Sequence, residues 1–280
     1  MAGRLSNSFA LMKASANVLK MDKELIVFPL MSGVAAVLVT ASFIAPLAVT
    51  GGFEFFAEDG GSYFAYSMAF VFYFVQYTVM FFFNSALVGA ALIRLAGGDP
   101  TVSDGLAIAS KRMPAILGYA AIAATVGMVL RALSERSGFL GRMVVGLVGM
   151  AWNLTTYLTV PVLVTKDVGP IDAVKESAAL FRKTWGEQVV GNFGMGWAIF
   201  LIGFVWSVVS VGMIVATASF LPGAAVLAVV GITVLGYVLL ALLASALKGV
   251  YTAALYRYAI TGEAGLFDES VLGNAFRPKG

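Results

Sequence analysis

Apolar residues follow one another in six long stretches, and short polar segments separate these stretches. A helix needs about 20 apolar residues to cross the hydrocarbon core of a bilayer, and each stretch reaches that length. The pattern therefore predicts an all-α polytopic membrane protein with six transmembrane helices. The predicted spans cover residues 25–49, 63–96, 114–133, 139–165, 189–217 and 224–260.

The first predicted span, residues 25–49, has a signal peptide as its alternative interpretation. A signal peptide carries an apolar region of about 7–15 residues. The apolar stretch here is longer, and it follows 24 residues that are polar and amphipathic. We therefore expect this span to be a retained transmembrane helix.

A short segment with apolar residues at helical spacing precedes each odd-numbered span. Apolar side chains that recur every three or four residues form one face of a helix, and basic residues end each segment. We therefore expect three amphipathic helices at the membrane interface, with basic residues that contact anionic head groups. The expected apolar faces are Leu5, Phe9, Met12, Ala16 and Leu19; Val102, Leu106, Ala109 and Met113; and Ile171, Val174, Ala178, Phe181 and Trp185. The candidate head-group contacts are Lys20, Lys23, Lys111, Arg112, Arg182 and Lys183.

One interfacial helix followed by one transmembrane hairpin would form a unit that occurs three times. Residues 90–96 read Ala-Ala-Leu-Ile-Arg-Leu-Ala, and residues 253–259 read Ala-Ala-Leu-Tyr-Arg-Tyr-Ala. The fourth span ends less similarly, and chance recurrence of Ala, Leu and Arg at helix ends is the alternative explanation. The three hairpins would share one orientation, unlike the inverted repeats of many secondary transporters.

Positive charge is distributed unequally between the two sides of the predicted bundle. Of the 18 Lys and Arg residues, 15 fall on the side that holds both termini, and only Arg131, Arg136 and Arg142 fall on the other. Basic loops stay in the cytoplasm, so we expect both termini there. The chain would form one transmembrane domain at residues 1–262, followed by a cytoplasmic tail at residues 263–280.

Composition argues against several classes of function. Of the 280 residues, 60% are apolar and 12% are charged, whereas soluble domains carry about 25% charged residues. The chain has no Cys and no His, so thiolate nucleophiles, the commonest general base and the commonest metal ligand are missing. The net charge of +3 is small, and the basic residues lie beside apolar spans, which argues against nucleic acid. We expect no enzyme activity, no cofactor and no bound metal.

Four polar residues inside the spans form a candidate polar path. Gln76 and Asn84 lie in the second span, and Asn153 and Thr156 lie in the fourth. Polar side chains at this depth either bond between helices or line a path, and the sequence leaves both alternatives open. No Asp or Glu lies in the middle of a span, which argues against ion-coupled transport.

Lys248 lies in the sixth span, where a Schiff base to retinal is one interpretation. That chemistry would need more helices and a carboxylate counter-ion, which the spans do not offer. We therefore expect Lys248 to extend its side chain to the cytoplasmic interface.

Several short motifs spread over nearly the whole chain resemble one family. They are residues 22–30 (Asp-Lys-Glu-Leu-Ile-Val-Phe-Pro-Leu), Trp152-Asn153, Val160-Pro161-Val162, Gly169-Pro170, residues 181–186 (Phe-Arg-Lys-Thr-Trp-Gly) and residues 275–278 (Ala-Phe-Arg-Pro). The family is an uncharacterised one of prokaryotic six-helix integral membrane proteins. The resemblance implies a multi-pass protein of the prokaryotic inner membrane and carries no activity. More loosely, the repeat is similar to the membrane domain of some glycerophosphodiester phosphodiesterases, whose catalytic domain this chain lacks.

These patterns favour a non-enzymatic membrane protein that associates with membrane lipid through its cytoplasmic helices. Other membrane protein subunits, or further copies of the same chain, are the alternative partners of these helices. The alternative function is a passive oligomeric channel or facilitator for a small solute or anion.

Overall fold

The computed structural model describes residues 2–50, 63–185, 194–220, 222–263 and 265–267. Every regular element in these ranges is a helix, which confirms the all-α prediction. In chain order the elements are α1 (Ala2–Met21), the 3₁₀ helix η1 (Lys23–Ile26), α2 (Val27–Thr50), α4 (Tyr63–Leu95), α5 (Val102–Lys111), α6 (Met113–Glu135), α7 (Phe139–Thr155), α8 (Thr159–Thr165), α9 (Pro170–Trp185), α10 (Gly194–Phe220) and α11 (Gly223–Thr261).

Six helical segments of the described chain are long and apolar enough to cross a membrane, and they confirm the six predicted spans. These segments are Lys23–Thr50, Tyr63–Leu95, Met113–Glu135, Phe139–Thr165, Ala198–Phe220 and Gly223–Thr261. Their bounds differ from the predicted ones by a few residues at most helix ends. The beginning of the predicted fifth span, residues 189–193, lies outside the described residues.

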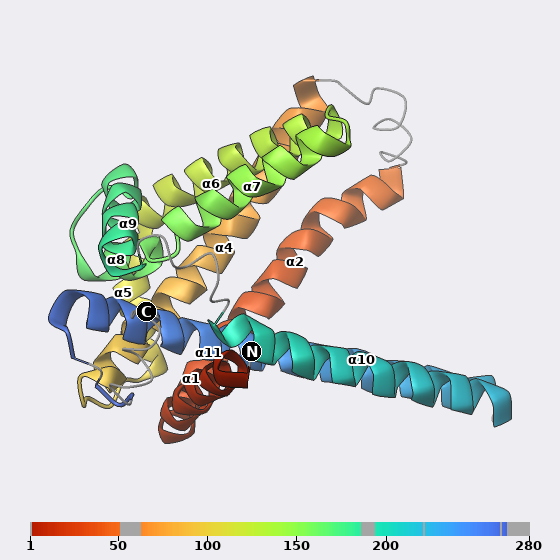
Figure 1. Cartoon of the computed structure of the whole chain (residues 1–280). Helices are drawn as coiled ribbons and strands as arrows, with labels where there is room; N and C mark the ends of the chain where they lie inside the picture. The colour runs from red at the N-terminus through yellow and green to blue at the C-terminus, as the bar shows by residue number, and fades with distance from the viewer. Residues whose placement is uncertain (1, 51–62, 186–193, 221, 264, 268–280) are drawn as a thin grey trace.

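The long helices lie close together at one end of the molecule and separate toward the other end (Figure 1). Helices α4, α6 and α7 stay together, α2 packs against α4, and the α10–α11 hairpin extends in another direction. The short helices α1, α5, α8 and α9 gather at the crowded end. We call it the basic end, and it is marked by Lys23, Arg94, Arg112, Lys166 and Arg257.

Each of the helices α1, α5 and α9 packs against a different hairpin. Helix α5 contacts α4, α9 contacts α8, α7 and α6, and α1 contacts α10 and α11. Each hairpin is therefore covered at the basic end by one short helix. This arrangement agrees with a threefold repeat, which stays a prediction.

The face of α1 that packs inward differs from the predicted face. Leu11, Ser15 and Val18 are buried, whereas Phe9 is 42% exposed and the side chain of Leu5 lies outside the described residues. The predicted stripe stays a prediction; the positions beside it, rather than Phe9, pack against α10 and α11.

Helix α9 shows a similar difference from the predicted face. Ala173 and Ser177 are buried, whereas Ile171 is 59% exposed. Small side chains let two helices approach closely, so positions with Ala and Ser face α7 and α8. The predicted contribution of Trp185 lies outside the described side chains.

The fourth span is broken, which the apolar pattern does not predict. Helix α7 ends at Thr155, and α8 begins at Thr159. Pro161 explains the break, because proline has no N–H and its ring collides with the carbonyl four residues earlier. Ser177 of α9 satisfies the freed backbone groups: its hydroxyl accepts from the N–H of Leu158 at 3.0 Å and donates to the carbonyl of Thr155 at 2.7 Å.

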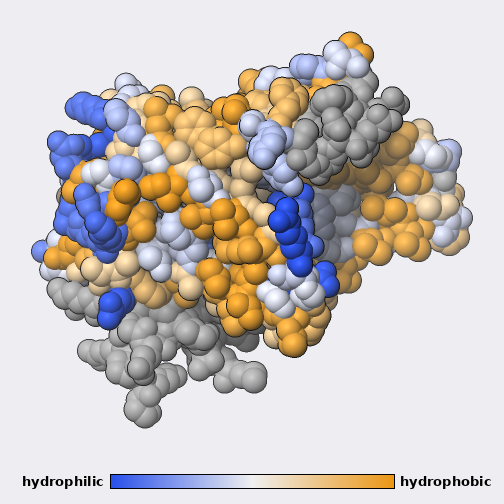
Figure 2. Space-filling view, turned by 90° about the horizontal axis from the view of Figure 1, so that it is seen from above, coloured by the Kyte–Doolittle hydropathy of each residue, from blue (hydrophilic) through white to orange (hydrophobic). Residues whose placement is uncertain are grey.

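The buried core lies at the basic end. Leu87 of α4, Leu163 of α8 and Tyr256 of α11 are each at most 1% exposed. Far from this end, Val49 and Phe220 are each 85% exposed, as expected for residues that face lipid. Figure 2 shows hydrophilic residues gathered at the left, which is the basic end, and apolar residues over much of the remaining described surface.

Candidate functional site

Two neighbouring side chains of α11 join the ends of the three hairpins at the basic end. The hydroxyl of Tyr256 lies 2.6 Å from Oγ1 of Thr165, the last residue of α8. Arg257 donates through Nη1 to the carbonyl oxygen of Leu95, the last residue of α4. The position of α11 therefore fixes where the other two hairpins end.

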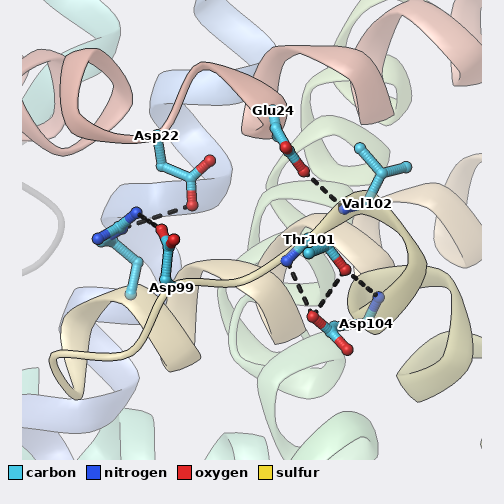
Figure 3. Close-up of polar contacts among 7 residues, drawn as sticks. Asp22, Glu24, Asp99, Thr101, Val102 and Asp104 are labelled. Atoms are coloured by element: carbon cyan, nitrogen blue, oxygen red, sulfur yellow. Dashed lines mark hydrogen bonds and ion pairs between the residues drawn. The ribbon is translucent and has the colours of Figure 1, made fainter.

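Arg94 connects the N-terminal segment to the end of α4. Asp22, between α1 and η1, is 5% exposed, and Nε of Arg94 donates to its Oδ2 at 3.4 Å. Arg94 also pairs with Asp99 in the α4–α5 connection (Figure 3). Burial raises the pKa of Asp22 above its usual range, although the guanidinium of Arg94 acts in the opposite direction. One guanidinium thus holds two carboxylates from different parts of the chain.

A second set of polar contacts anchors the beginning of α5 to η1 (Figure 3). Glu24 accepts a hydrogen bond from the N–H of Val102 at 2.8 Å. Thr101 and Asp104 form a capping box, in which each side chain accepts from the backbone N–H of the other residue. The bonds from Thr101 favour the ionised carboxylate and lower the pKa of Asp104.

Four of the six predicted head-group contacts are alike in their exposure and in their lack of a described ion-pair partner. Each has an exposed side chain and makes no ion pair with any residue that the structure describes. They lie on α1, η1, α5 and α9 at the basic end. These four residues are Lys20, Lys23, Lys111 and Arg182.

Arg112 differs from these four residues. Its guanidinium forms an ion pair with Asp167, and its side chain is only 24% exposed. The pair joins the beginning of α6 to the connection between α8 and α9. Arg112 therefore holds two elements together, and its contact with a head group stays a prediction. Lys183 belongs to α9, but its side chain lies outside the described residues.

A cavity of about 670 Å³ lies between α2, α4, α6, the α7–α8 break and α11. Three of the four residues of the predicted polar path line it, namely Asn84, Asn153 and Thr156. Neither Asn84 nor Asn153 makes a hydrogen bond with another described residue, so their amide groups are available within the cavity. The structure thus brings together residues of the second and fourth spans, as the sequence suggested.

Gln76 does not line the cavity. Its Nε2 donates to Oγ1 of Thr40 at 2.6 Å and to the carbonyl of Ala36 at 3.1 Å. These bonds tie α4 to α2, so interhelical bonding describes Gln76 better than a polar path. The four candidate residues therefore do not line one continuous path.

Lys248 of α11 lines the same cavity, which the sequence pattern does not reveal at first sight. It makes no ion pair with any described residue. Ser245, Gly249 and Thr252 line the cavity beside it. Because residues three and four apart share one face of a helix, this spacing is the signal that could have revealed the cavity face of α11.

The chemistry available at these sites is binding through charge and hydrogen bonds. No group of three carboxylate, imidazole or thiol side chains within the described ranges could hold a metal ion. The polar groups of the residues around the cavity are one ammonium, two amides, one indole N–H and several hydroxyls. Such groups accept or position an anionic or hydrogen-bonding ligand.

Six apolar helices of membrane-spanning length, together with a polar, tightly bonded end, define a polytopic α-helical membrane protein. The chain belongs to a family of unknown function, DUF6159, which matches residues 63–267. Comparison with curated proteins and with solved structures gave no match. The family match agrees with the resemblance to an uncharacterised family. The looser resemblance to the membrane domain of glycerophosphodiester phosphodiesterases is not shown.

Proposed function

We propose that this protein is a non-enzymatic membrane protein whose basic end binds anionic lipid head groups in the cytoplasmic leaflet of a prokaryotic inner membrane. The observation that carries the proposal is the set of exposed, unpaired cations on α1, η1, α5 and α9. Other cations at this end are already engaged, such as Arg94 with Asp22 and Arg112 with Asp167. The free cations therefore remain for an outside partner.

Their position relative to the spans supports lipid as that partner. Lys23 begins η1, four residues before α2 begins at Val27, and Lys111 lies two residues before α6 begins at Met113. Basic residues immediately next to a span lie at head-group level, and each gains about 1 kcal/mol near an anionic membrane surface. The apolar faces of the neighbouring spans would hold these residues at that level.

Native mass spectrometry of the full-length protein tests the proposal. The protein is delipidated in mild detergent and offered phosphatidylglycerol and phosphatidylcholine with identical acyl chains. We expect more bound phosphatidylglycerol than phosphatidylcholine. A triple variant, Lys20→Gln, Lys23→Gln and Lys111→Gln, should lose this preference.

A control variant carries Arg131→Gln, Arg136→Gln and Arg142→Gln at the opposite end of the bundle. It removes the same number of charges and should keep the wild-type preference. Equal preference in all three proteins would overturn the proposal. A specific complex with another membrane protein or a second copy, lost in the first variant alone, would assign the same residues to a protein partner instead.

A further inference from the structure

The cavity between α2, α4, α6, α7 and α11 has a positive charge of its own, separate from the cations of the basic end. Lys248 is the only ionisable side chain of fixed charge among its lining residues, and no carboxylate of the described chain lines it. A lysine within a membrane-spanning segment needs water, a phosphate or a counter-ion. The cavity is therefore a positively charged recess between the helices.

The lining changes from polar to apolar along the bundle. Tyr256 marks the basic end of α11, and Lys248 lies eight residues before it, roughly 12 Å along the helix axis. Asn84 lies eleven residues before the end of α4 at Leu95, roughly 16 Å away. On the same helix as Lys248, Thr252 and Ser245 lie roughly 6 Å and 16 Å from the basic end. The ammonium of Lys248 and the amide of Asn84 thus lie in the half of the cavity nearer the basic end.

The deeper half of the cavity, which lies farther from the basic end, is mostly apolar. Met80 of α4, Val126 and Leu130 of α6, and Gly149 and Trp152 of α7 line it, together with Tyr77 of α4, whose hydroxyl is a polar group at this depth. Leu130 lies seventeen residues after the beginning of α6, roughly 26 Å from the basic end. The described residues that line this half carry no charge and no side-chain amide. A ligand with one polar end and one apolar end matches it.

The cavity can be reached from the side of the bundle. Helix α4 packs against α2, α6 and α11, but α7 makes no extensive contact with α2 or α11. Lys248 and Asn153 have exposed side chains, and Met80 is 44% exposed. The opening therefore faces the region that the acyl chains of a bilayer would occupy.

We infer that this cavity binds a single-chain amphiphile with an anionic head group. The carboxylate or phosphate accepts hydrogen bonds from Lys248 and from the amides of Asn84 and Asn153. The acyl chain lies along Met80 and Leu130 in the deeper half. A fatty acid and a lysophospholipid share this chemistry. The site is independent of the cations on α1, η1 and α5.

Binding of radiolabelled palmitate and of lysophosphatidylglycerol to the full-length protein in non-ionic detergent tests this inference. Monopalmitoylglycerol has the same acyl chain and no charge. We expect the anionic amphiphiles to bind about tenfold or more tightly than the neutral one, because a charge-assisted hydrogen bond is lost. Saturation by both anionic amphiphiles indicates recognition of the shared chemistry, and saturation by one identifies the source.

Two variants and their controls locate the site. Lys248→Gln should weaken binding of the anionic amphiphiles about tenfold, whereas Lys248→Arg and Lys111→Gln should not. Gly149→Leu should fill the deeper half and abolish binding, since the nearest atom to a Cβ there is Cδ1 of Leu130 at 3.8 Å. Gly146→Leu, on the same helix with no atom within 4 Å, is its control. Thermal unfolding verifies that each variant is folded.

Unchanged binding by both Lys248→Gln and Gly149→Leu would overturn the inference. So would equal affinity for the neutral amphiphile, or full competition by inorganic phosphate alone. Loss of lipid preference in the variant Lys20→Gln, Lys23→Gln and Lys111→Gln with intact amphiphile binding would separate the two sites. The reverse result, with intact preference and lost binding in Lys248→Gln, would separate them equally well.

Discussion

The hydroxyl of Tyr256 lies 2.6 Å from Oγ1 of Thr165, and this contact joins the end of α11 to the end of α8. The side chain of Tyr256 is 1% exposed, so its hydroxyl has no access to water as an alternative partner. The adjacent residue, Arg257, reaches the carbonyl of Leu95 on α4. Hydrogen bonds from two consecutive residues thus determine how three hairpins meet.

Tyr256→Phe removes the hydroxyl and leaves the ring in place. We expect the free energy of unfolding to fall by about 1 kcal/mol, because one interhelical hydrogen bond is lost. Thermal unfolding in detergent measures the change. Tyr63→Phe removes a hydroxyl from a residue that is 93% exposed and should have no effect. Equal stability of Tyr256→Phe and the wild type would show that the contact does not stabilise the junction.

Lys111 and Arg112 are adjacent cations that we expect to have different roles. Arg112→Gln breaks the ion pair with Asp167 and should lower the free energy of unfolding by about 1 kcal/mol, with phosphatidylglycerol preference retained. Lys111→Gln should reduce that preference and leave stability unchanged. Unfolding and native mass spectrometry on both variants give the comparison. Identical effects of the two substitutions would contradict the division into paired and free cations.

Asp22 and Asp104 should make the free energy of unfolding depend on pH in opposite directions. The pKa of Asp22 lies above the ordinary value of 3.8 in the folded protein, so the folded state binds more protons than the unfolded state between the two values. Its contribution to stability is therefore full below pH 3.8 and is lost as the pH rises through the raised pKa. The pKa of Asp104 lies below 3.8, so its contribution is present above that pH and is lost on acidification.

Unfolding of Asp22→Asn and Asp104→Asn across the acidic range measures these contributions. Asp22→Asn should remove the decrease in stability with rising pH. Asp104→Asn should remove the loss on acidification and also weaken the cap of α5. A pH dependence that is unchanged in both variants would show that other carboxylates determine it.

The six spans and the three short helices can be predicted because apolar stretch length and helical spacing are local properties of the chain. The break between α7 and α8 has a local signal in Pro161, but an uninterrupted apolar stretch hides it. The partner of the break cannot be predicted, since Ser177 reaches it from another helix. The buried faces of α1 and α9 also depend on their neighbours, so the sequence alone does not show that Phe9 and Ile171 lie outside these faces.

The candidate site can be predicted only in part. Asn84, Asn153 and Thr156 stand out because polar residues are rare in apolar spans, and they do line one cavity. Gln76 shares that rarity but bonds to Thr40, a pairing that depends on how α2 and α4 align. The sequence predicts that Lys248 extends to the interface, whereas in the structure this residue lines the cavity. A single sequence cannot show which way α11 turns it.

We propose that the end formed by α1, α5 and α9 lies in the cytoplasmic leaflet. The chain has no Cys, so single cysteines can be placed at two exposed glycines where an added Cβ would meet no atom within 4 Å: Gly169 between α8 and α9, and Gly138 between α6 and α7. Cells that express Gly138→Cys or Gly169→Cys are treated with a thiol reagent that does not cross the inner membrane. We predict labelling of Gly138→Cys in intact cells and of Gly169→Cys only after permeabilisation. Labelling of Gly169→Cys alone in intact cells would contradict the orientation and, with it, the proposed contact with the cytoplasmic leaflet.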